Sequence, residues 1–307
     1  MTRRLYSSKG GHALPTFLPM SARVFLVTTL VLLGVSLTAQ RLPSRLGGPV
    51  GPPPKAGPAR PTPAKPGTAA PAAAPRPTGP EKAVPFRPGE SLTYDVSWSD
   101  YLTAGSATLT VRDKRPSGGS TAYYLVAEGR PTTLMSKLYA VYYKADSLVD
   151  AYTLFPQRGS VFSQENGRQR MKETRFDQAR RSATFQMRTA TTMTQDQPLP
   201  GPTHDGLSAL TAMRTMTLAP GASSAFSVSD SGYLYRVRAI VAGKEPIKTG
   251  LGTAAAWKIV PAVRDAKGQT VGRGMAVWIS DDARRLPLRI EAQLPVGTFV
   301  LTLREAR

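Results

Sequence analysis

The C-terminal stretch Gly274–Leu303, GMAVWISDDARRLPLRIEAQLPVGTFVLTL, decides the fold class of this chain. In its middle, apolar Leu288 and Ile290 alternate with polar side chains. A period of two sends one set of side chains to a core and the other to water, as in a half-buried β-strand. Short connecting segments at 281–285 and 295–297 separate this run from an apolar run on either side. The stretch therefore predicts three antiparallel strands joined by tight turns.

The same alternation recurs from Leu92 onward, in short runs separated by Gly, Pro and Asn-Gly turn signals. It predicts a mainly β domain, built as a strongly curved antiparallel sheet that forms a half-barrel or an open barrel. Two short helices are expected within it, one in Pro131–Ala140 and one after an N-cap at Asp205. A loop is expected at Gln195–Pro202 and a turn at Gly243.

Residues 1–41 are interpreted as an export segment. The run Val24–Ala39 has 16 uncharged, mostly apolar residues and follows a basic segment. Its length lies between about 7–15 residues for signal-peptide cores and about 17–25 for membrane spans, so a cleaved signal peptide and a retained inner-membrane anchor both stay open. A buried core helix is disfavoured, because a low-complexity tract follows directly. Both open interpretations send the rest of the chain to the periplasm or the cell envelope.

Residues 42–85 are rich in Pro, Ala and Gly and carry sparse basic residues. Such a composition cannot bury a core, so we expect a disordered linker with polyproline II character. It is either a spacer that holds a domain away from a membrane or a tolerated insertion. The folded β domain is expected over residues 86–307.

The composition excludes several kinds of site. The chain has no Cys, which rules out disulfides, Cys–zinc sites, thiol catalysis and thiol-anchored lipid. The net charge of +20 is divided evenly between residues 1–90 and residues 91–307, at +10 each. No basic helix or nucleic-acid-binding motif accompanies it, so we expect no nucleic acid as a partner. A basic surface is the simplest interpretation, and a polyanionic envelope partner such as lipid headgroups or wall polymers stays open.

The few candidate catalytic residues have structural alternatives. His12 and His204 are the two His residues, which excludes a His cluster for zinc. A Ser-His-Asp triad would need His204, yet the chain has no G-x-S-x-G elbow, and a loop residue beside the N-cap is the alternative. The adjacent Asp281 and Asp282 are interpreted as turn formers and ion-pair partners rather than cation ligands. We expect a protein that is not an enzyme and that holds neither a metal nor a cofactor.

A family resemblance is carried by four segments: Phe86–Val96 (FRPGESLTYDV), Asp205–Leu210 with Arg214, Trp278–Pro287 (WISDDARRLP) and Val296–Phe299 (VGTF). In this order they resemble the opening, the central helix and the ending of the DUF3108 family of exported bacterial proteins. The resemblance spans residues 86–305 and implies a β-rich domain without an established activity. It further implies a shape similar to the half-barrels of the lipoprotein-localisation carriers (LolA/LolB-like), in which a curved sheet and a helical lid form an apolar cavity. The chain departs from lipoproteins at Gln40, where the lipid-bearing Cys would stand.

The expected binding site is an apolar cavity on the concave side of the sheet, lined by aromatic residues and covered by the first short helix. Its candidate residues are Trp98, Tyr101, Tyr124, Leu134, Met135, Leu138, Tyr139 and Tyr142. The leading hypothesis is a non-enzymatic periplasmic or cell-envelope binding module for an acyl chain, a lipid or a lipoprotein, which contacts the membrane through its N-terminal segment if that segment is retained. The alternative is a structural or interaction protein of the cell envelope with a solid core. A dry cavity of about 300–1,000 Å³ would favour the carrier.

Replacing Val31 and Leu32 by Arg is expected to strand the protein in the cytoplasm, because each central charge costs roughly 2.5–3.5 kcal/mol on insertion. Cell fractionation of the Val31→Arg/Leu32→Arg variant, with the wild-type chain beside it, measures the effect. Unchanged export of the double variant would contradict the assignment of the apolar run.

Overall fold

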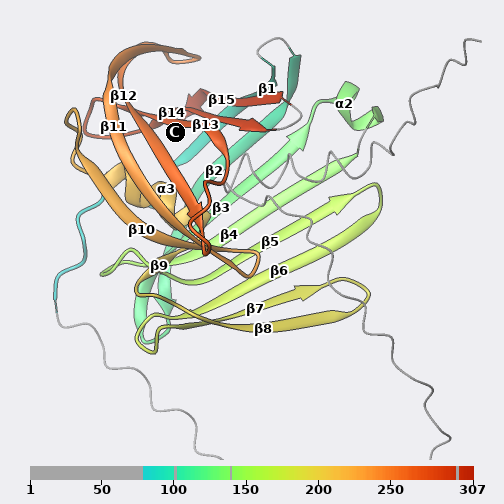
Figure 1. Cartoon of the computed structure of the whole chain (residues 1–307). Coiled ribbons are helices and arrows are strands. Elements are labelled where there is room, and N and C mark those ends of the chain that lie inside the picture. The colour runs from blue at the N-terminus through green and yellow to red at the C-terminus, as the bar shows by residue number, and fades with distance from the viewer. Residues whose placement is uncertain (1–78, 100–101, 139, 295–296) are drawn as a thin grey trace, which may run out of the picture.

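The computed structural model describes residues 79–99, 102–138, 140–294 and 297–307. The described residues form a 15-stranded sheet and two helices (Figure 1). The apolar run Val24–Ala39 and residues 42–78 of the expected linker lie outside them. Within the described ranges, no helix is long and apolar enough to cross a membrane.

The first half of the sheet contains eight strands: β1 (Ser91–Trp98), β2 (Leu102–Ser117), β3 (Ser120–Pro131), β4 (Val141–Asp150), β5 (Pro156–Glu165), β6 (Arg168–Asp177), β7 (Ser182–Arg188) and β8 (Thr192–Pro198). The second half contains seven: β9 (Thr203–His204), β10 (Ser223–Asp230), β11 (Tyr233–Thr249), β12 (Gly252–Asp265), β13 (Arg273–Ser280), β14 (Pro287–Leu294) and β15 (Gly297–Ala306). The helices are α2 (Thr133–Leu138), between β3 and β4, and α3 (Gly206–Thr215), between β9 and β10.

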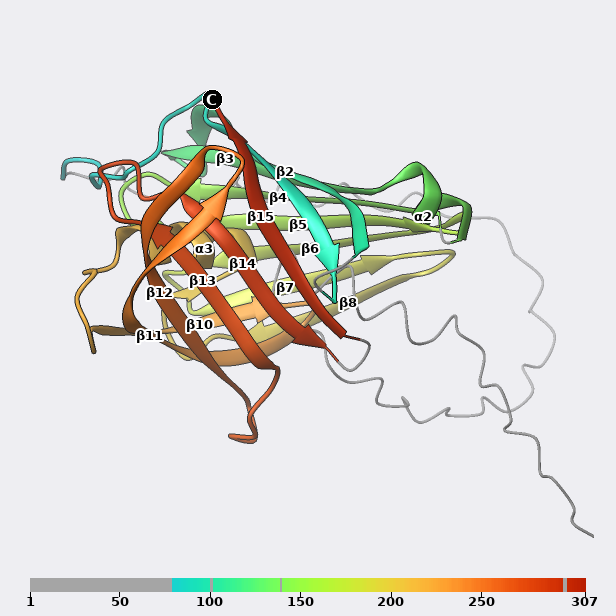
Figure 2. The same ribbon diagram turned by 90° about the horizontal axis from the view of Figure 1, so that it is seen from above.

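Apart from β8 and β9, strands that follow one another in the chain are neighbours in the sheet, and the first and last strands pair with each other at its centre. The strand order runs from β8 through β7 to β1, then from β15 through β14 to β9, so β1 and β15 pair at the centre and β8 and β9 are the edges. All neighbours are antiparallel except β9 and β10. The strands β10–β13 curl over one end of the sheet, while β4–β8 extend away from it (Figures 1 and 2). The prediction of a mainly β fold with a strongly curved, open sheet is confirmed.

Both predicted helices are present. The helix expected in Pro131–Ala140 forms as α2, and the N-cap of α3 is Asp205, as predicted. Asp205 Oδ1 accepts a hydrogen bond from Ser208 N at 2.8 Å, and Asp205 N donates to Ser208 Oγ at 3.0 Å. This reciprocal capping box satisfies backbone groups that a helix start leaves unpaired.

Two predicted connections are wrong. The first four residues of the predicted loop Gln195–Pro202 belong to the edge strand β8, most of whose side chains are exposed. An exposed strand has no apolar alternation, so the sequence pattern did not reveal it. Gly243 does not turn the chain, because β11 continues through it with a register shift against β12 between Val241 and Gly243. Such a bulge bends a strand without ending it.

The helix α3 lies inside the curve of the sheet (Figure 1). Its Leu207 joins a cluster with side chains of β1–β4, β14 and β15. Its Met213 packs against β11–β13, and its Ala209 packs against β10–β12. Within the helix, Thr215 is the one exposed residue. A helix that contacts apolar side chains in three directions is a central part of the core rather than a surface layer.

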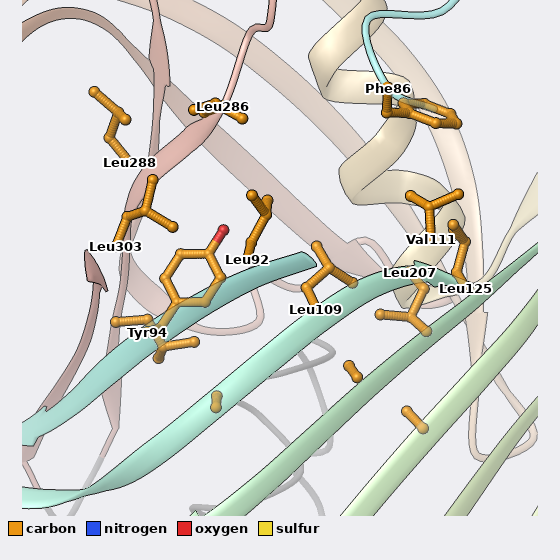
Figure 3. Close-up of a cluster of buried hydrophobic side chains, with 14 of the residues drawn as sticks. Phe86, Leu92, Tyr94, Leu109, Val111, Leu125, Leu207, Leu286, Leu288 and Leu303 are labelled. Carbon is orange, nitrogen blue, oxygen red and sulfur yellow. The ribbon is translucent and has the colours of Figure 1, made fainter. Parts of the chain in front are cut away.

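The largest apolar cluster contains side chains of the first four strands, of α3 and of the C-terminal hairpin β14–β15. Figure 3 shows these side chains pointing toward one another. The labelled members are Phe86, Leu92, Tyr94, Leu109, Val111, Leu125, Leu207, Leu286, Leu288 and Leu303. The buried hydroxyl of Tyr94 donates to the carbonyl oxygen of Pro287 at 2.9 Å, which satisfies its polar group within the core.

The buried guanidinium of Arg214 joins three distant parts of the chain. Its Nη1 and Nη2 donate to the two carboxylate oxygens of Glu90 at 2.6 and 3.1 Å, and these side chains are 1% and 6% exposed. It also donates to the carbonyl oxygens of Arg284 and Arg285, both at 3.0 Å, and lies 5.3 Å from the centre of the Phe86 ring. A buried charge is costly unless it is paired and hydrogen-bonded. These contacts therefore hold the segment before β1, the helix α3 and the β13–β14 turn together.

Replacing Arg214 by Met is expected to lower the free energy of unfolding by about 3–5 kcal/mol, because Glu90 is left as an unpaired buried charge. The Arg214→Met/Glu90→Gln double variant should lose less than the sum of the two single variants. Arg304→Met, which breaks an exposed ion pair with Asp95, should cost less than about 1 kcal/mol. Chemical denaturation measures all four variants, and additive losses in the double variant would contradict the coupling.

Candidate functional site

One face of the sheet, which we call the inner face, is turned toward α3. On β4, the buried side chains of Tyr143, Ala145 and Val149 belong to the core on this face, and Ser147 lies between them. Successive residues of a strand point to opposite faces, and residues paired on neighbouring strands point to the same face. The face of each residue can therefore be followed from β4 to the other strands. A site enclosed by the curve of the sheet must therefore be built from inner-face residues.

Two predicted lining residues, Tyr124 and Tyr142, lie on the outer face and do not line such a site. The guanidinium of Arg115 lies 4.3 Å from the centre of the Tyr124 ring, and that of Arg130 lies 4.8 Å from the centre of the Tyr142 ring. Their chain neighbours Tyr123 and Tyr143 enter the core instead. A difference of one residue reverses the face of a strand, and two adjacent tyrosines give no signal of which one points inward.

The structure does not bring the other candidate residues together at one cavity. Trp98 is half-buried and stacks on Phe299, with ring centroids 6.2 Å apart. On α2, Met135 is half-buried and Leu134 is 64% exposed, so Leu134 does not cover an apolar cavity. Tyr101, Tyr139 and the side chain of Leu138 lie outside the part of the chain that is described.

A small cavity remains between α3 and the inner face of β4–β7. Its volume is about 30 Å³, which is room for about one water molecule. Asp205, Lys172 and Asp230 contribute polar lining, and Leu207 and Phe185 contribute apolar lining. An acyl chain does not fit a space of this size.

Asp205 holds the start of α3 close to the sheet. Its Oδ2 accepts a hydrogen bond from Ser147 Oγ at 2.6 Å. The same oxygen lies 2.6 Å from the place where a Cβ at Gly159 would stand, so only glycine allows this approach. Burial raises the pKa of Asp205, and hydrogen bonds from Ser147 and Ser208 oppose the rise. The carboxyl group is thus engaged by β4 and by its own helix.

His204 is enclosed in the core. Its ring lies between Phe155 and Phe226, with ring centroids 4.6 and 5.4 Å away, and its Nδ1 is 3.1 Å from Ser208 Oγ. The residue is 5% exposed. Burial and, to a lesser degree, the positive charge of Lys82 together lower the pKa of His204 from 6.5 to about 4. A general base must come within hydrogen-bond reach of its substrate, so this position favours the structural interpretation of His204.

Side chains of β6 and β8 form hydrogen bonds with the turn between β10 and β11. Lys172 Nζ on β6 donates to Ser231 Oγ at 2.8 Å, and Gln197 Nε2 on β8 donates to the carbonyl oxygen of Gly232 at 2.9 Å. Burial lowers the pKa of the Lys172 amine, an effect that the charge of Asp230 opposes. These contacts close the inner part of the curve, although β8 and β9 are not paired in the sheet.

A larger hollow lies on the inner face at some distance from α3. It is formed by the end of β5, the start of β6 and the residues that follow β7. Its volume is about 350 Å³. Its lining includes Ser163, Glu165, Arg168, Arg170 and Thr189. We call it the arginine hollow. None of the candidate residues expected from the sequence lies in this hollow. The alternation Arg168, Arg170, Lys172 was the signal that could have found it, because it sends three cations to one face.

Over residues 79–307, apart from the undescribed positions, no group of three His, Asp or Glu side chains is arranged to hold a metal ion. The acidic pair at the β13–β14 turn is engaged by the turn's own backbone and by neighbouring strands. Asp282 Oδ1 accepts from the backbone N–H groups of Arg284 and Arg285 at 3.0 Å each, and Asp281 accepts from Trp257 Nε1 at 2.7 Å.

Comparison with known families gives one match. The model of the family described as a protein of unknown function, DUF3108, matches residues 93–304 and confirms the resemblance drawn from the sequence. No curated protein matches the chain.

Several solved structures are similar to this chain. A β-barrel-like protein of the DUF1849 domain from Brucella abortus has a TM-score of 0.46 and 9% identity, over 72% of this chain and 98% of that chain. A candidate exported protein with a YmcC-like fold from Bacteroides fragilis has a TM-score of 0.30 and 8% identity, over 73% and 100%. A candidate lipoprotein from Parabacteroides distasonis has a TM-score of 0.32 and 9% identity, over 73% and 98%.

Because the pKa of His204 falls from 6.5 to about 4 on folding, the unfolded chain binds a proton between these pH values and the folded protein does not. The free energy of unfolding is therefore expected to fall by up to about 3 kcal/mol as the pH is lowered from 6.5 to 4. Denaturation curves measured across this range should show the loss in wild type and in the His12→Gln control. The His204→Gln variant should lack this component, and a slope equal to that of wild type would contradict the assignment.

Proposed function

The chain belongs to the DUF3108 family, whose function is unknown, and we propose that its β domain is a non-enzymatic binding module of the cell envelope with a filled core. In this proposal the domain meets its partner through its surface and its open inner face. It does not enclose an acyl chain.

The packing of α3 carries this proposal. The helix occupies the curve of the sheet, and Leu207, Ala209 and Met213 pack against three different groups of strands. The cavity left beside it is about 30 Å³, far below the roughly 300–1,000 Å³ typical of small-molecule sites. An acyl chain would have to displace α3 and break the buried pair of Arg214 with Glu90. The geometry therefore favours the interaction protein over the lipid carrier.

The positions of the candidate catalytic groups support the non-enzymatic part of the proposal. His204 lies between two aromatic rings inside the core. Ser208, which contacts it, is fully buried, and its hydroxyl donates to the carbonyl oxygen of Asp205 at 3.2 Å. The small cavity near the start of α3 is lined by Asp205 but by neither His204 nor Ser208.

The cell-envelope location in this proposal is supported by the N-terminal sequence. The apolar run Val24–Ala39 and the Pro-rich tract after it are interpreted as export segment and spacer, and both precede the β domain. A partner exposed in the periplasm or on a membrane surface would lie within reach of a domain tethered in this way. An envelope lipid or lipoprotein remains a partner that the surface of the domain can contact.

Native mass spectrometry of the full chain purified from its own envelope is expected to show the protein without a stoichiometric acyl lipid. The wild type should also bind no fluorescent fatty acid in its core. Leu207→Ala should lower the free energy of unfolding by about 2–5 kcal/mol, because it removes packing from the centre of the core.

Leu251→Ala provides the matched control, because Leu251 is 53% exposed and its loss should leave stability nearly unchanged. A co-purifying acyl lipid at one copy per chain would refute the filled-core proposal. Wild-type stability of Leu207→Ala would also count against it.

A further inference from the structure

The inner face of β6 carries a row of cations, which pair on β5 with Glu165, Ser163 and Val161. Arg168, Arg170 and Lys172 occupy alternate positions, so their side chains share one face and stand about 6.8 Å apart. Strand pairing identifies this face as the inner one, because Arg170 pairs with Ser163, and Lys172 pairs with Val161, which packs against the main core cluster. Inward-facing cations on a sheet require either partners or water.

The row divides into two parts. Lys172 lies in the closed part, where its amine donates to Ser231 Oγ at 2.8 Å. Arg168 and Arg170 lie farther out, and both line the arginine hollow. The hollow therefore begins where the contacts to the β10–β11 turn end.

The lining of the arginine hollow has an excess of positive charge. It contains two guanidinium groups and one carboxylate, that of Glu165, which is 6% exposed. The net charge is +1 whichever of the two arginines the carboxylate approaches. Arg168 makes no side-chain hydrogen bond or ion pair with any described residue, and its side chain is exposed at the rim. A cation in such a position is available to a ligand.

The chemistry of the lining suits an oxyanion. Guanidinium groups bind phosphate through paired, charge-assisted hydrogen bonds. The hydroxyl groups of Ser163 and Thr189 are further donors in the lining. A tetrahedral phosphate presents oxygens to both arginines at once, whereas the two coplanar oxygens of a carboxylate match one guanidinium. The volume of about 350 Å³ accommodates a phosphate with part of the group that carries it.

We infer that the arginine hollow binds a phosphate group through Arg168 and Arg170. The inference rests on the proposed function, since it names the class of ligand for a module that binds through its open inner face. The phosphate belongs either to a soluble phosphate compound or to the headgroup of an anionic lipid. The acyl part of a lipid stays outside the domain in both cases, because the core is filled.

Calorimetric titration of the full chain with inorganic phosphate tests the site. Wild type is expected to bind saturably and less tightly as salt is raised. The Arg168→Gln/Arg170→Gln variant should bind at least about 10-fold more weakly, because it loses charge-assisted hydrogen bonds. Arg175→Gln/Arg180→Gln removes the same charge from side chains that are 70% and 82% exposed, and it should bind like wild type. Equal affinity of wild type and the Arg168→Gln/Arg170→Gln variant would overturn the inference.

Vesicles distinguish the two sources of the phosphate. Binding to phosphatidylglycerol vesicles but not to phosphatidylcholine vesicles, lost in Arg168→Gln/Arg170→Gln, would assign the phosphate to a lipid headgroup. Saturable binding of inorganic phosphate with no such vesicle binding would assign it to a soluble compound. Phosphatidylglycerol binding that survives the double substitution, together with no phosphate binding, would reject the site.

If the double variant does not fold, the site can still be tested by measuring the amide chemical shifts of the wild-type chain with and without phosphate. Added phosphate is expected to shift the amides of Ser163, Arg168, Arg170 and Thr189, and shifts confined to other regions would overturn the site. This outcome is separate from that of the filled core. Absence of phosphate binding rejects the arginine hollow alone, whereas an acyl lipid within the core rejects the proposed function.

Discussion

The buried pair of Arg214 and Glu90 is the interaction on which the arrangement of this domain depends. A guanidinium that is 1% exposed requires an acceptor for each of its N–H directions, and it finds them in a carboxylate before β1 and in two carbonyl oxygens of the β13–β14 turn. These partners lie more than 120 and about 70 residues away along the chain. The pair thus fixes α3 against the centre of the sheet, where the first and last strands meet.

The position of α3 then decides what kind of interior the sheet has. A curved sheet of this size encloses space, and in this protein the helix occupies it. The helix can come close to the sheet because Gly159 leaves room for the Asp205 carboxylate, and small side chains such as Ala127 and Ala145 form part of the inner face. At this closed end of the curve, a cavity of about 30 Å³ remains between α3 and β4–β7. The end beyond the β10–β11 contacts keeps an open, polar hollow, where we propose that a phosphate-bearing partner binds.

Local patterns predicted the elements well and the site poorly. The alternating runs, the Gly, Pro and Asn-Gly turn signals and the N-cap at Asp205 are local signals, and the strands and α3 follow them. The edge strand β8 was missed, because a strand whose side chains face water lacks the alternation that identifies one. The aromatic residues were assigned to a cavity because they are large and apolar. Tyr124 and Tyr142 instead contact arginines on the outer face, since the register, which the sequence does not display, selected their neighbours for the core.

The sequence by itself determined the mainly β class, the family, and the absence of cysteine chemistry. It also contained the three segments around Glu90, Arg214 and Arg284–Arg285, but nothing local shows that they meet. Only the tertiary structure decided that α3 fills the curve, that His204 is enclosed between aromatic rings, and that the cations of β6 divide between a closed and an open region. The physical reason is that periodicity reports which face a side chain shares with its own strand or helix. What that face meets depends on pairings between residues far apart in the chain, and those are set by the packing of the whole domain.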